Sequence, residues 1–136
     1  MRYLLDSNIC IEAINDPGSA VVLRMRKESP DDIKLSVIVW FELSFGACKS
    51  ARKSDNLARL ETFAAPFELV DFSPDDALTA GEVRAGLERK GQPIGPYDLL
   101  IAAQALNRGL TLVTNNEREF KRVPGLKIEN WIKRKR

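Results

Sequence analysis

The sequence predicts an α/β fold, a three-layer α/β/α sandwich around a mainly parallel central sheet. Short apolar runs of strand length alternate along the chain with longer amphipathic segments of helix length, which is typical of β–α–β units. The 136 residues, 44% hydrophobic and 29% charged, match the size and composition of one domain with a substantial core. We expect this domain to cover residues 1–132, and residues 133–136 to form a basic C-terminal tail.

Five short segments are predicted as strands because they are apolar or alternate between apolar and polar residues. The first contains Tyr3-Leu4-Leu5 and stops abruptly at Asp6. The clearest is Leu110-Thr111-Leu112-Val113-Thr114, which ends in a second polar group at Asn115 and Asn116. In chain order the predicted strands are residues 2–5, 33–36, 67–72, 110–114 and 126–128, the last at an edge of the sheet.

The segments between these strands are predicted as helices, bounded by proline, glycine and small polar residues. The strongest start signal is Ser73 followed by Pro74, with Asp76 completing a capping box. Gly91 ends that helix. The helix dipole accounts for Asp75 and Asp76 in the first turn, so we assign no chemistry to them. The predicted helices cover residues 7–15, a segment starting at residue 19, and residues 37–47, 57–64, 73–90 and 96–106.

The composition excludes several kinds of chemistry. Without histidine, the chain has no histidine-based triad, proton shuttle or metal site. Cys10 and Cys48 lie within apolar or helical patterns, so we expect buried thiols in a reducing compartment rather than a disulfide or a zinc site. No segment is long enough to span a membrane and no signal peptide is evident, so we expect a cytoplasmic protein. A net charge of +2 neither indicates nor opposes nucleic-acid binding.

Three acidic residues interrupt apolar segments, where an isolated buried carboxylate is costly. Asp6 separates the first strand from the helix that follows it. Glu42 and Asp98 lie on the helices at 37–47 and 96–106, which are apolar on most sides and expected to be largely buried. Each acid has an ordinary structural explanation: Asp6 can cap a helix, Glu42 can lie on a helix surface, and Asp98 can interact with a helix dipole.

The predicted topology gives these acids a shared location. The two strands that end in polar clusters, near Asp6 and Asn116, run in parallel, and parallel strands place such ends at one edge of the sheet. Glu42 and Asp98 lie on helices that can pack across that edge, and Glu119 lies one helical turn beyond Asn116. Four gathered carboxylates repel one another unless a cation binds them, and oxygen ligands suit Mg²⁺ or Mn²⁺. Such a metal activates water, so the site can hydrolyse phosphodiesters without histidine.

Four segments, in this order along the chain, match the motifs of one known family. They are Tyr3-Leu4-Leu5-Asp6-Ser7-Asn8-Ile9; Phe41-Glu42-Leu43 with Gly46; Pro93-Ile94-Gly95-Pro96-Tyr97-Asp98-Leu99-Leu100-Ile101-Ala102; and Leu112-Val113-Thr114-Asn115-Asn116 with Arg118-Glu119-Phe120, Val123-Pro124-Gly125-Leu126 and Glu129-Asn130-Trp131. With these motifs the chain resembles PIN-domain ribonucleases, and specifically the VapC toxins of bacterial type II toxin–antitoxin pairs. The resemblance covers nearly the whole chain and implies a PIN-like fold.

The resemblance implies a metal-dependent endoribonuclease that uses Mg²⁺, with Mn²⁺ as a substitute. By resemblance, the catalytic acids that hold the metal are Asp6, Glu42, Asp98 and Glu119. Asn116 would orient Asp6 or the attacking water. The chain departs from the family at three positions: Ser7 replaces the usual threonine, Val39 a commonly polar residue, and Glu119 the aspartate of many relatives. None of these changes removes an acid, so an active enzyme is expected.

The resemblance also implies partners. Such toxins usually form homodimers and bind a VapB antitoxin, whose C-terminal segment lies in a groove near the active site and often inserts an arginine there. Candidate groove residues are the apolar helix positions Ile9, Ile11, Val39 and Trp40. The family's substrate is structured RNA, often tRNA, cut in a single-stranded loop. Basic clusters at residues 24–27, 49–53 and 133–136 either contact the RNA backbone or are simply solvated.

Two other functions fit part of the pattern. A phosphatase of the haloacid dehalogenase type would use Asp6 as a covalent nucleophile, but it needs a second aspartate two residues later, where this chain has Asn8. A catalytically inactive PIN-fold RNA-binding or interaction domain is the stronger alternative, because a fold does not imply a function. Inactive members usually lose acids, whereas this chain keeps all four, which favours the enzyme.

Overall fold

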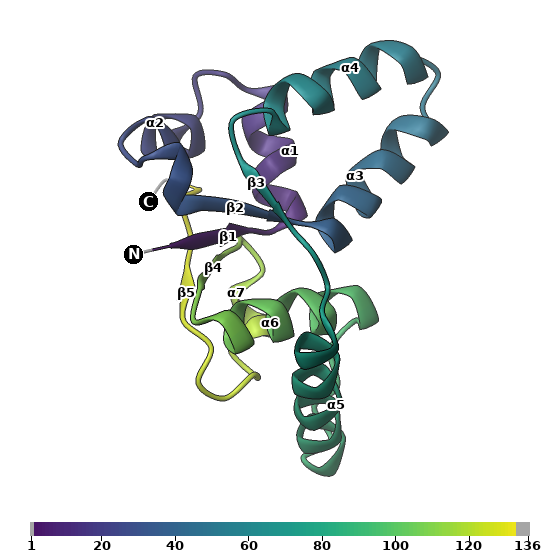
Figure 1. Cartoon of the computed structure of the whole chain (residues 1–136), viewed down its shortest axis with the longest axis vertical. Helices are drawn as coiled ribbons and strands as arrows, with labels where there is room; N and C mark the ends of the chain where they lie inside the picture. Colours follow the sequence, from purple (N-terminus) through teal and green to yellow (C-terminus); the bar gives the residue numbers. More distant parts are fainter. Residues whose placement is uncertain (1, 133–136) are drawn as a thin grey trace.

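A sheet of five parallel strands organises the structure, a computed structural model that describes residues 2–132 (Figure 1). The strand order is β3-β2-β1-β4-β5, so β1 lies in the centre between β2 and β4. Because every pairing in this sheet is parallel, the carboxyl ends of its strands meet at one edge. The strands are β1 Tyr3–Leu5, β2 Ile33–Ser36, β3 Glu68–Val70, β4 Thr111–Val113 and β5 Ile128–Glu129.

Helices lie on both sides of the sheet. In Figure 1, helices α1 to α4 lie above strands β1 and β2, and helices α5 to α7 lie below them. The predicted α/β/α sandwich with a parallel sheet is therefore confirmed, whereas the basic tail at 133–136 lies outside the described residues. The helices are α1 Ser7–Asn15, α2 Ala20–Arg26, the 3₁₀ helix η1 Pro30–Asp32, α3 Val37–Lys49, α4 Lys53–Ala64, α5 Pro74–Arg89, α6 Pro96–Arg108 and α7 Glu117–Phe120.

Several elements differ from the sequence prediction, among them α4, β3 and α7. Helix α4 begins at Lys53 rather than at residue 57, and an ion pair of 2.9 Å between Arg52 and Asp55 stabilises its polar first turn. Strand β3 is shorter than predicted because it lies at the edge of the sheet, where only β2 pairs with it. Helix α7 was not predicted, since its four residues are too few to show a helical period.

Helix α3 is less buried than predicted. Its inner stripe, Val39, Leu43 and Ala47, recurs every four residues and packs into the core. On its outer side, Phe41 and Phe45 are 49% and 59% exposed, so the expectation of a largely buried helix is wrong for that side. The two thiols, both expected to be buried, differ in exposure. Cys10 on α1 is buried as expected, but Cys48, near the end of α3, is exposed.

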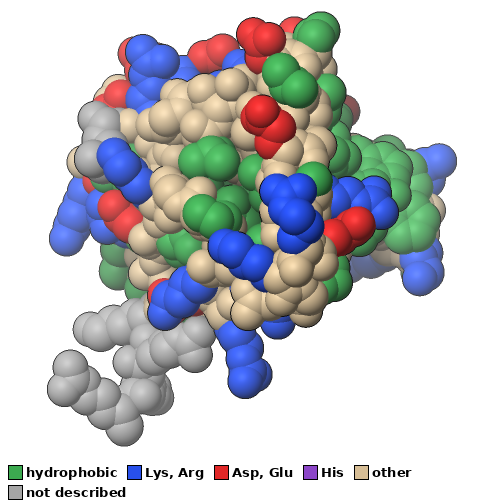
Figure 2. All heavy atoms as spheres, turned by 90° about the horizontal axis from the view of Figure 1, so that it is seen from below, with side chains coloured by type: hydrophobic (Ala, Val, Ile, Leu, Met, Phe, Trp, Pro, Cys, Tyr) green, Lys and Arg blue, Asp and Glu red, His purple; other side chains and the backbone are tan. Residues whose placement is uncertain are grey.

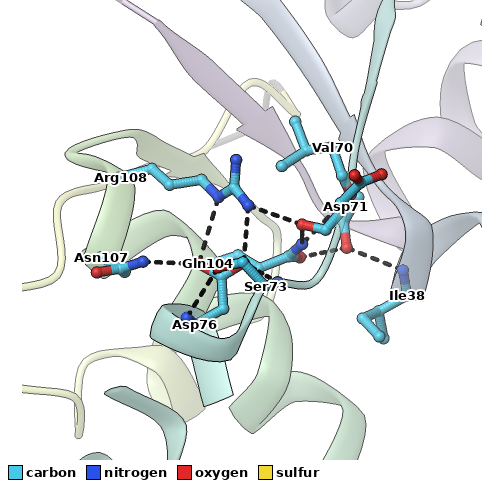
Figure 3. A network of polar contacts seen from close by, with 9 residues as sticks. Ile38, Val70, Asp71, Ser73, Asp76, Gln104, Asn107 and Arg108 are labelled. Carbon is cyan, nitrogen blue, oxygen red and sulfur yellow. Dashed lines mark hydrogen bonds and ion pairs between the residues drawn. The ribbon is translucent and has the colours of Figure 1, made fainter. Parts of the chain in front are cut away.

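A polar network joins α5 to the C-terminal end of α6 (Figure 3). The predicted capping box is present: the Asp76 amide donates to the Ser73 hydroxyl at 3.1 Å, and the Ser73 amide donates to Asp76 Oδ2 at 2.8 Å. The fully buried Asp76 carboxylate also accepts hydrogen bonds from Asn107 Nδ2 and Arg108 Nη2, each at 2.8 Å. These bonds hold one end of α6, and Asp98 lies in the first turn at its other end.

The C-terminal segment returns to the start of the chain. The rings of Tyr3 and the buried Trp131 meet edge to face with their centroids 5.0 Å apart. The Arg24 guanidinium lies 4.7 Å from the Trp131 ring centroid and forms ion pairs with Glu28 and Glu129. Arg24 is therefore committed to internal contacts. None of the helices in the described part of the chain is long and apolar enough to cross a membrane.

Candidate active site

The two central strands bring polar side chains together where they end. Leu5 of β1 pairs with Val113 of β4, so the next residues, Asp6 and Thr114, are neighbours. The Thr114 hydroxyl donates a hydrogen bond to Asp6 Oδ2 at 2.7 Å, and both residues are buried. Asp6 Oδ1 accepts a hydrogen bond from the Ser7 amide at 2.8 Å and so caps α1. Asp6 therefore caps α1 through Oδ1 and contacts the polar group at the end of β4 through Oδ2.

Burial sets the electrostatic state of Asp6. Desolvation raises the pKa of this carboxyl, and the hydrogen bonds from Thr114 and the Ser7 amide offset part of that rise. The negative charge of Glu119 raises the pKa of Asp6 further. Asp6 and Glu119 are therefore close enough to repel each other, although one comes from the start of the chain and the other from α7.

Asp98 and Glu119 form a carboxyl–carboxylate pair. Asp98 lies in the first turn of α6, Glu119 lies in α7, and their side chains share a hydrogen bond. Burial, this hydrogen bond and the repulsion of the surrounding carboxylates raise the pKa of Asp98 far above its usual range. The pKa of Glu119 is lowered, chiefly by the hydrogen bond from Asp98. The two carboxyls therefore share a proton, which lies in the hydrogen bond between them.

Two further donors fix Glu119. Asn116 Nδ2 donates to Glu119 Oε1 at 3.0 Å, and the Gly95 amide donates to Glu119 Oε2 at 3.2 Å. The resemblance implied that Asn116 orients Asp6 or the attacking water. In the structure the Asn116 side chain donates to Glu119, and the Thr114 hydroxyl donates to Asp6. Asn116 therefore orients an acid of the cluster, and its role toward the attacking water stays a prediction.

Glu42, on α3, completes the acidic group. Its carboxyl raises the pKa of Asp98, and its own pKa is raised by burial and by the charge of Asp6, with a hydrogen bond from Ser7 acting in the opposite direction. Glu42 Oε1 is buried and has no hydrogen-bond partner among residues 2–132. Because a buried carboxylate oxygen without a donor is costly, this atom is suited to bind a cation.

The residues present fit a hard divalent cation such as Mg²⁺ or Mn²⁺. Burial is the largest cause of the raised pKa values of Asp6, Glu42 and Asp98, and repulsion between neighbouring carboxylates adds to it; a bound cation would relieve that repulsion. A Cβ at Gly95 would lie 3.4 Å from Asp98 Oδ2 and 3.9 Å from Glu119 Oε2, so this glycine leaves space beside both carboxyls. As they stand, no three acids of the described chain converge closely enough to hold one ion. Binding of a cation by both carboxyls would displace the proton between Asp98 and Glu119.

The four acids were predicted from the sequence, whereas no role was predicted for Thr114. The structure brings Asp6, Glu42, Asp98 and Glu119 within electrostatic reach of one another. Their roles in catalysis stay predictions. The sequence did indicate a possible role for Thr114. Its hydroxyl directly follows a predicted strand that pairs with β1, which places it beside Asp6.

Comparisons with known proteins agree over nearly the full length. Residues 3–126 match the PIN domain family. The tRNA(fMet)-specific endonuclease VapC of Salmonella typhimurium is 41% identical, with 96% of this chain and 98% of that protein aligned. Ribonuclease VapC2 of Rickettsia felis is 43% identical over 98% of this chain and all of the relative's length (100%). This chain belongs to the VapC ribonucleases of the PIN-domain family.

Solved VapC structures share the architecture described above. The crystal structure of DNA-bound VapBC from Salmonella typhimurium matches with a TM-score of 0.92 at 41% identity, covering 96% of this chain and 98% of that one. VapBC2 from Rickettsia felis, bound to a DNA fragment from its promoter, matches with a TM-score of 0.91 at 42% identity, covering 96% and 99%. The resemblance to VapC toxins and the PIN-like fold are confirmed, and the phosphatase alternative is set aside.

Replacing Thr114 with valine in this VapC chain is expected to lower metal-dependent cleavage by about ten- to a hundredfold. Valine keeps the shape of threonine but cannot donate to Asp6, and it also loses the acceptor for the Asn116 amide, now at 2.9 Å. Initial cleavage rates at several Mn²⁺ concentrations measure the effect. Thr114→Ser is the matched control, because it keeps the hydroxyl and should retain most of the activity; equal rates for the two variants would contradict this role.

Proposed function

We propose that this chain is the toxin of a type II toxin–antitoxin pair and cleaves structured RNA, specifically tRNA, in a Mg²⁺-dependent reaction. The observation that carries the proposal is the group of crowded carboxylates, Asp6, Glu42 and Asp98, whose pKa values are all raised beside Glu119. Such a group is electrostatically unfavourable until a cation binds, and oxygen ligands select hard cations. Membership of the VapC ribonucleases supports phosphodiester hydrolysis as the reaction.

In this reaction the side chains bind and orient. Asp6 and Asp98 would be the principal metal ligands, with Glu42 and Glu119 as the others. Thr114 holds Asp6 in place. When bound, Mg²⁺ lowers the pKa of a coordinated water and stabilises charge on the departing oxygen. Since the proton shared by Asp98 and Glu119 must leave before both carboxyls can bind the metal, metal affinity should rise with pH through the neutral range.

The names of relatives and the basic side chains support tRNA as the substrate. Relatives from Salmonella typhimurium and Shigella flexneri, 41% and 40% identical, are named tRNA(fMet)-specific endonucleases. Figure 2 shows Lys and Arg side chains distributed over the face seen from below. Of the predicted basic clusters, that at residues 49–53 is exposed where α3 meets α4, whereas that at 24–27 keeps only Arg26 and Lys27 exposed. We propose that these side chains contact the RNA backbone.

We propose a VapB-type antitoxin as the partner, in keeping with the solved VapBC complexes of relatives. A groove of about 480 Å³ runs between α1, α3 and α4, and it reaches the acidic cluster at Glu42, which lines it. An arginine of a bound helical or extended segment could pair with those acids there. Of the predicted groove residues, Ile11 lines it, but Ile9 and Val39 are fully buried in the core and cannot. The half-buried Trp40 packs against the core.

We propose a homodimer in the cytoplasm, where tRNA is present. Large apolar side chains remain exposed on the single chain, including Phe45 on α3 and Leu78 on α5. The rings of Phe41 and Tyr97, which are about half exposed, pack together with their centroids 5.4 Å apart and extend this apolar surface. Exposed apolar surface of this kind is typical of protein–protein contacts.

The test is cleavage of total tRNA by purified protein in Mg²⁺, in Mn²⁺ and in EDTA. Discrete fragments that require the metal are expected, and sequencing their ends identifies the cleaved tRNA and the cut position. The alternative of an inactive PIN-fold RNA-binding domain predicts no fragments in any metal and no binding of Mn²⁺ in calorimetry. Fragments that persist in EDTA would contradict a metal-dependent reaction.

A further inference from the structure

The loop before α6 is fastened to the turn that follows α7. Arg122 Nη1 donates a hydrogen bond to the Pro93 carbonyl at 2.8 Å. The Gly95 amide donates to Glu119 Oε2 at 3.2 Å, and the Arg122 amide donates to the Glu119 carbonyl at 3.1 Å. Arg122 and Glu119 thus lie one turn apart and hold the same short loop at two points. The loop is residues 93–95 and leads directly into Pro96, the first residue of α6.

The position of this loop bears on the geometry of the acids. Gly95 is the N-cap of α6, and its carbonyl accepts the Leu99 amide at 2.9 Å, so the loop sets where the first turn of α6 begins. Asp98 lies in that turn. A Cβ built at Gly95 would lie within 4 Å of carboxyl oxygens of both Asp98 and Glu119, so the loop passes beside both side chains. A shift of the loop would therefore move Asp98 relative to Glu119.

We propose that Arg122 is a positioning residue of the metal site, which acts by holding the Pro93 carbonyl and thereby the Gly95 amide against Glu119. The inference rests on the proposed metal-dependent function. Arg122 is exposed, and its side-chain hydrogen bond goes to the loop rather than to a carboxyl, although its charge also lowers the pKa of Glu119. Groups that orient metal ligands typically change metal affinity when they are removed, even though they do not bind the metal themselves.

Arg122 has a matched control on the same short element. Arg118 is an exposed arginine on α7, and within the described chain no hydrogen bond or ion pair of its side chain reaches the loop. Arg118→Gln and Arg122→Gln remove the same charge at a similar place in the sequence. Any effect of net charge on RNA attraction should therefore be alike in the two variants. Only Arg122→Gln removes a positive charge that acts on Glu119, and that removal by itself favours a cation, so weaker Mn²⁺ binding by Arg122→Gln would come from the loosened loop.

The experiment is calorimetric titration of Mn²⁺ into the full chain, without RNA, for the wild type and for Arg122→Gln, Arg118→Gln and Arg122→Lys. We expect Arg122→Gln to weaken Mn²⁺ binding by about tenfold. Arg118→Gln should bind as the wild type does, and Arg122→Lys, which keeps a charged donor, should recover most of the loss. In cleavage assays, the Mn²⁺ concentration for half-maximal rate should rise by the same factor, while kcat at saturating Mn²⁺ and KM for RNA stay unchanged.

Three outcomes would overturn the role of Arg122. Equal Mn²⁺ affinity in Arg122→Gln and Arg118→Gln would show that the loop contact does not position the ligands. A rise in KM for RNA with unchanged Mn²⁺ affinity would make Arg122 a phosphate contact instead. If Arg122→Gln lowers the thermal unfolding midpoint and Arg122→Lys restores it without restoring Mn²⁺ affinity, the contact is only structural. Failure of the proposed function itself would look different, because the wild type would then bind no Mn²⁺.

Discussion

Asp98→Asn is expected to lower RNA cleavage by about a thousandfold or more, the scale reached when one preorganised electrostatic group of an active site is removed. The carboxamide keeps the volume of the side chain but loses the charge that binds the metal. The fold should be retained, because burial and neighbouring carboxylates already disfavour the charged form of Asp98 and raise its pKa. Initial rates of tRNA cleavage at saturating Mg²⁺ measure the effect.

In the absence of metal, Asp98→Asn is also expected to change the stability of the fold in one direction. The pKa of Asp98 is raised in the folded state, so the unfolded chain releases this proton more readily than the folded chain. The folded protein therefore loses stability as the pH rises above 3.8, the pKa of Asp98 in the unfolded chain. Asparagine does not titrate, so Asp98→Asn should unfold at the same or a higher temperature than the wild type at pH 7. Asp75→Asn, an exposed carboxylate on α5, is the control and should keep full activity. Unchanged cleavage by Asp98→Asn would remove Asp98 from the mechanism.

Asp76→Ala is expected to have the largest effect on stability, a loss of about 2–4 kcal/mol in the free energy of unfolding. The change removes a fully buried carboxylate that accepts hydrogen bonds from the Ser73 amide, Asn107 and Arg108, and it leaves those donors without their partner. Urea unfolding monitored by circular dichroism measures the loss. Asp75→Ala is the matched control, because Asp75 is exposed in the same helical turn. Equal midpoints for the two variants would contradict an anchoring role for Asp76.

The stabilisation of the fold by the Asp76 carboxylate depends on pH. Burial raises the pKa of Asp76, but the hydrogen bonds from Arg108, the Ser73 amide and Asn107 outweigh it and lower the pKa from 3.8 to about 2. Because the folded pKa is depressed, this stabilisation is complete above the unfolded value and is lost as pH falls from about 4 toward 2. The shift corresponds to about 2 kcal/mol. The stability of the wild type should therefore approach that of Asp76→Ala as the pH is lowered through this range.

The parallel sheet and the location of the acids could be predicted because both follow from local patterns. An apolar run of strand length that stops at Asp6 predicts a buried strand with a carboxylate at its end. Parallel pairing then places Thr114 beside it, since side chains at equivalent strand ends must be neighbours. In the same way, Ser73, Pro74 and Asp76 predicted the start of α5 from three neighbouring positions.

What could not be predicted depends on contacts between distant residues. The helix dipole was a sufficient local explanation for Asp76, yet its main partners lie 31 and 32 residues away on α6. Asn116 was close enough in the sequence to Glu119 for their hydrogen bond to be foreseen, but the choice between Asp6 and Glu119 depends on Thr114. The exposure of Phe41 also escaped prediction, because an apolar residue on a helix can face the core or another molecule.

The bond between Thr114 and Asp6 joins residues 108 positions apart, and this distance sets when activity can arise during synthesis. The central strand β1 is the first to leave the ribosome, but its neighbour β4 is among the last. Until then Asp6 has no hydroxyl to hold it, and Glu119 has not been made. A growing chain therefore lacks the assembled site, and the nuclease forms only after β4 and α7 have been synthesised.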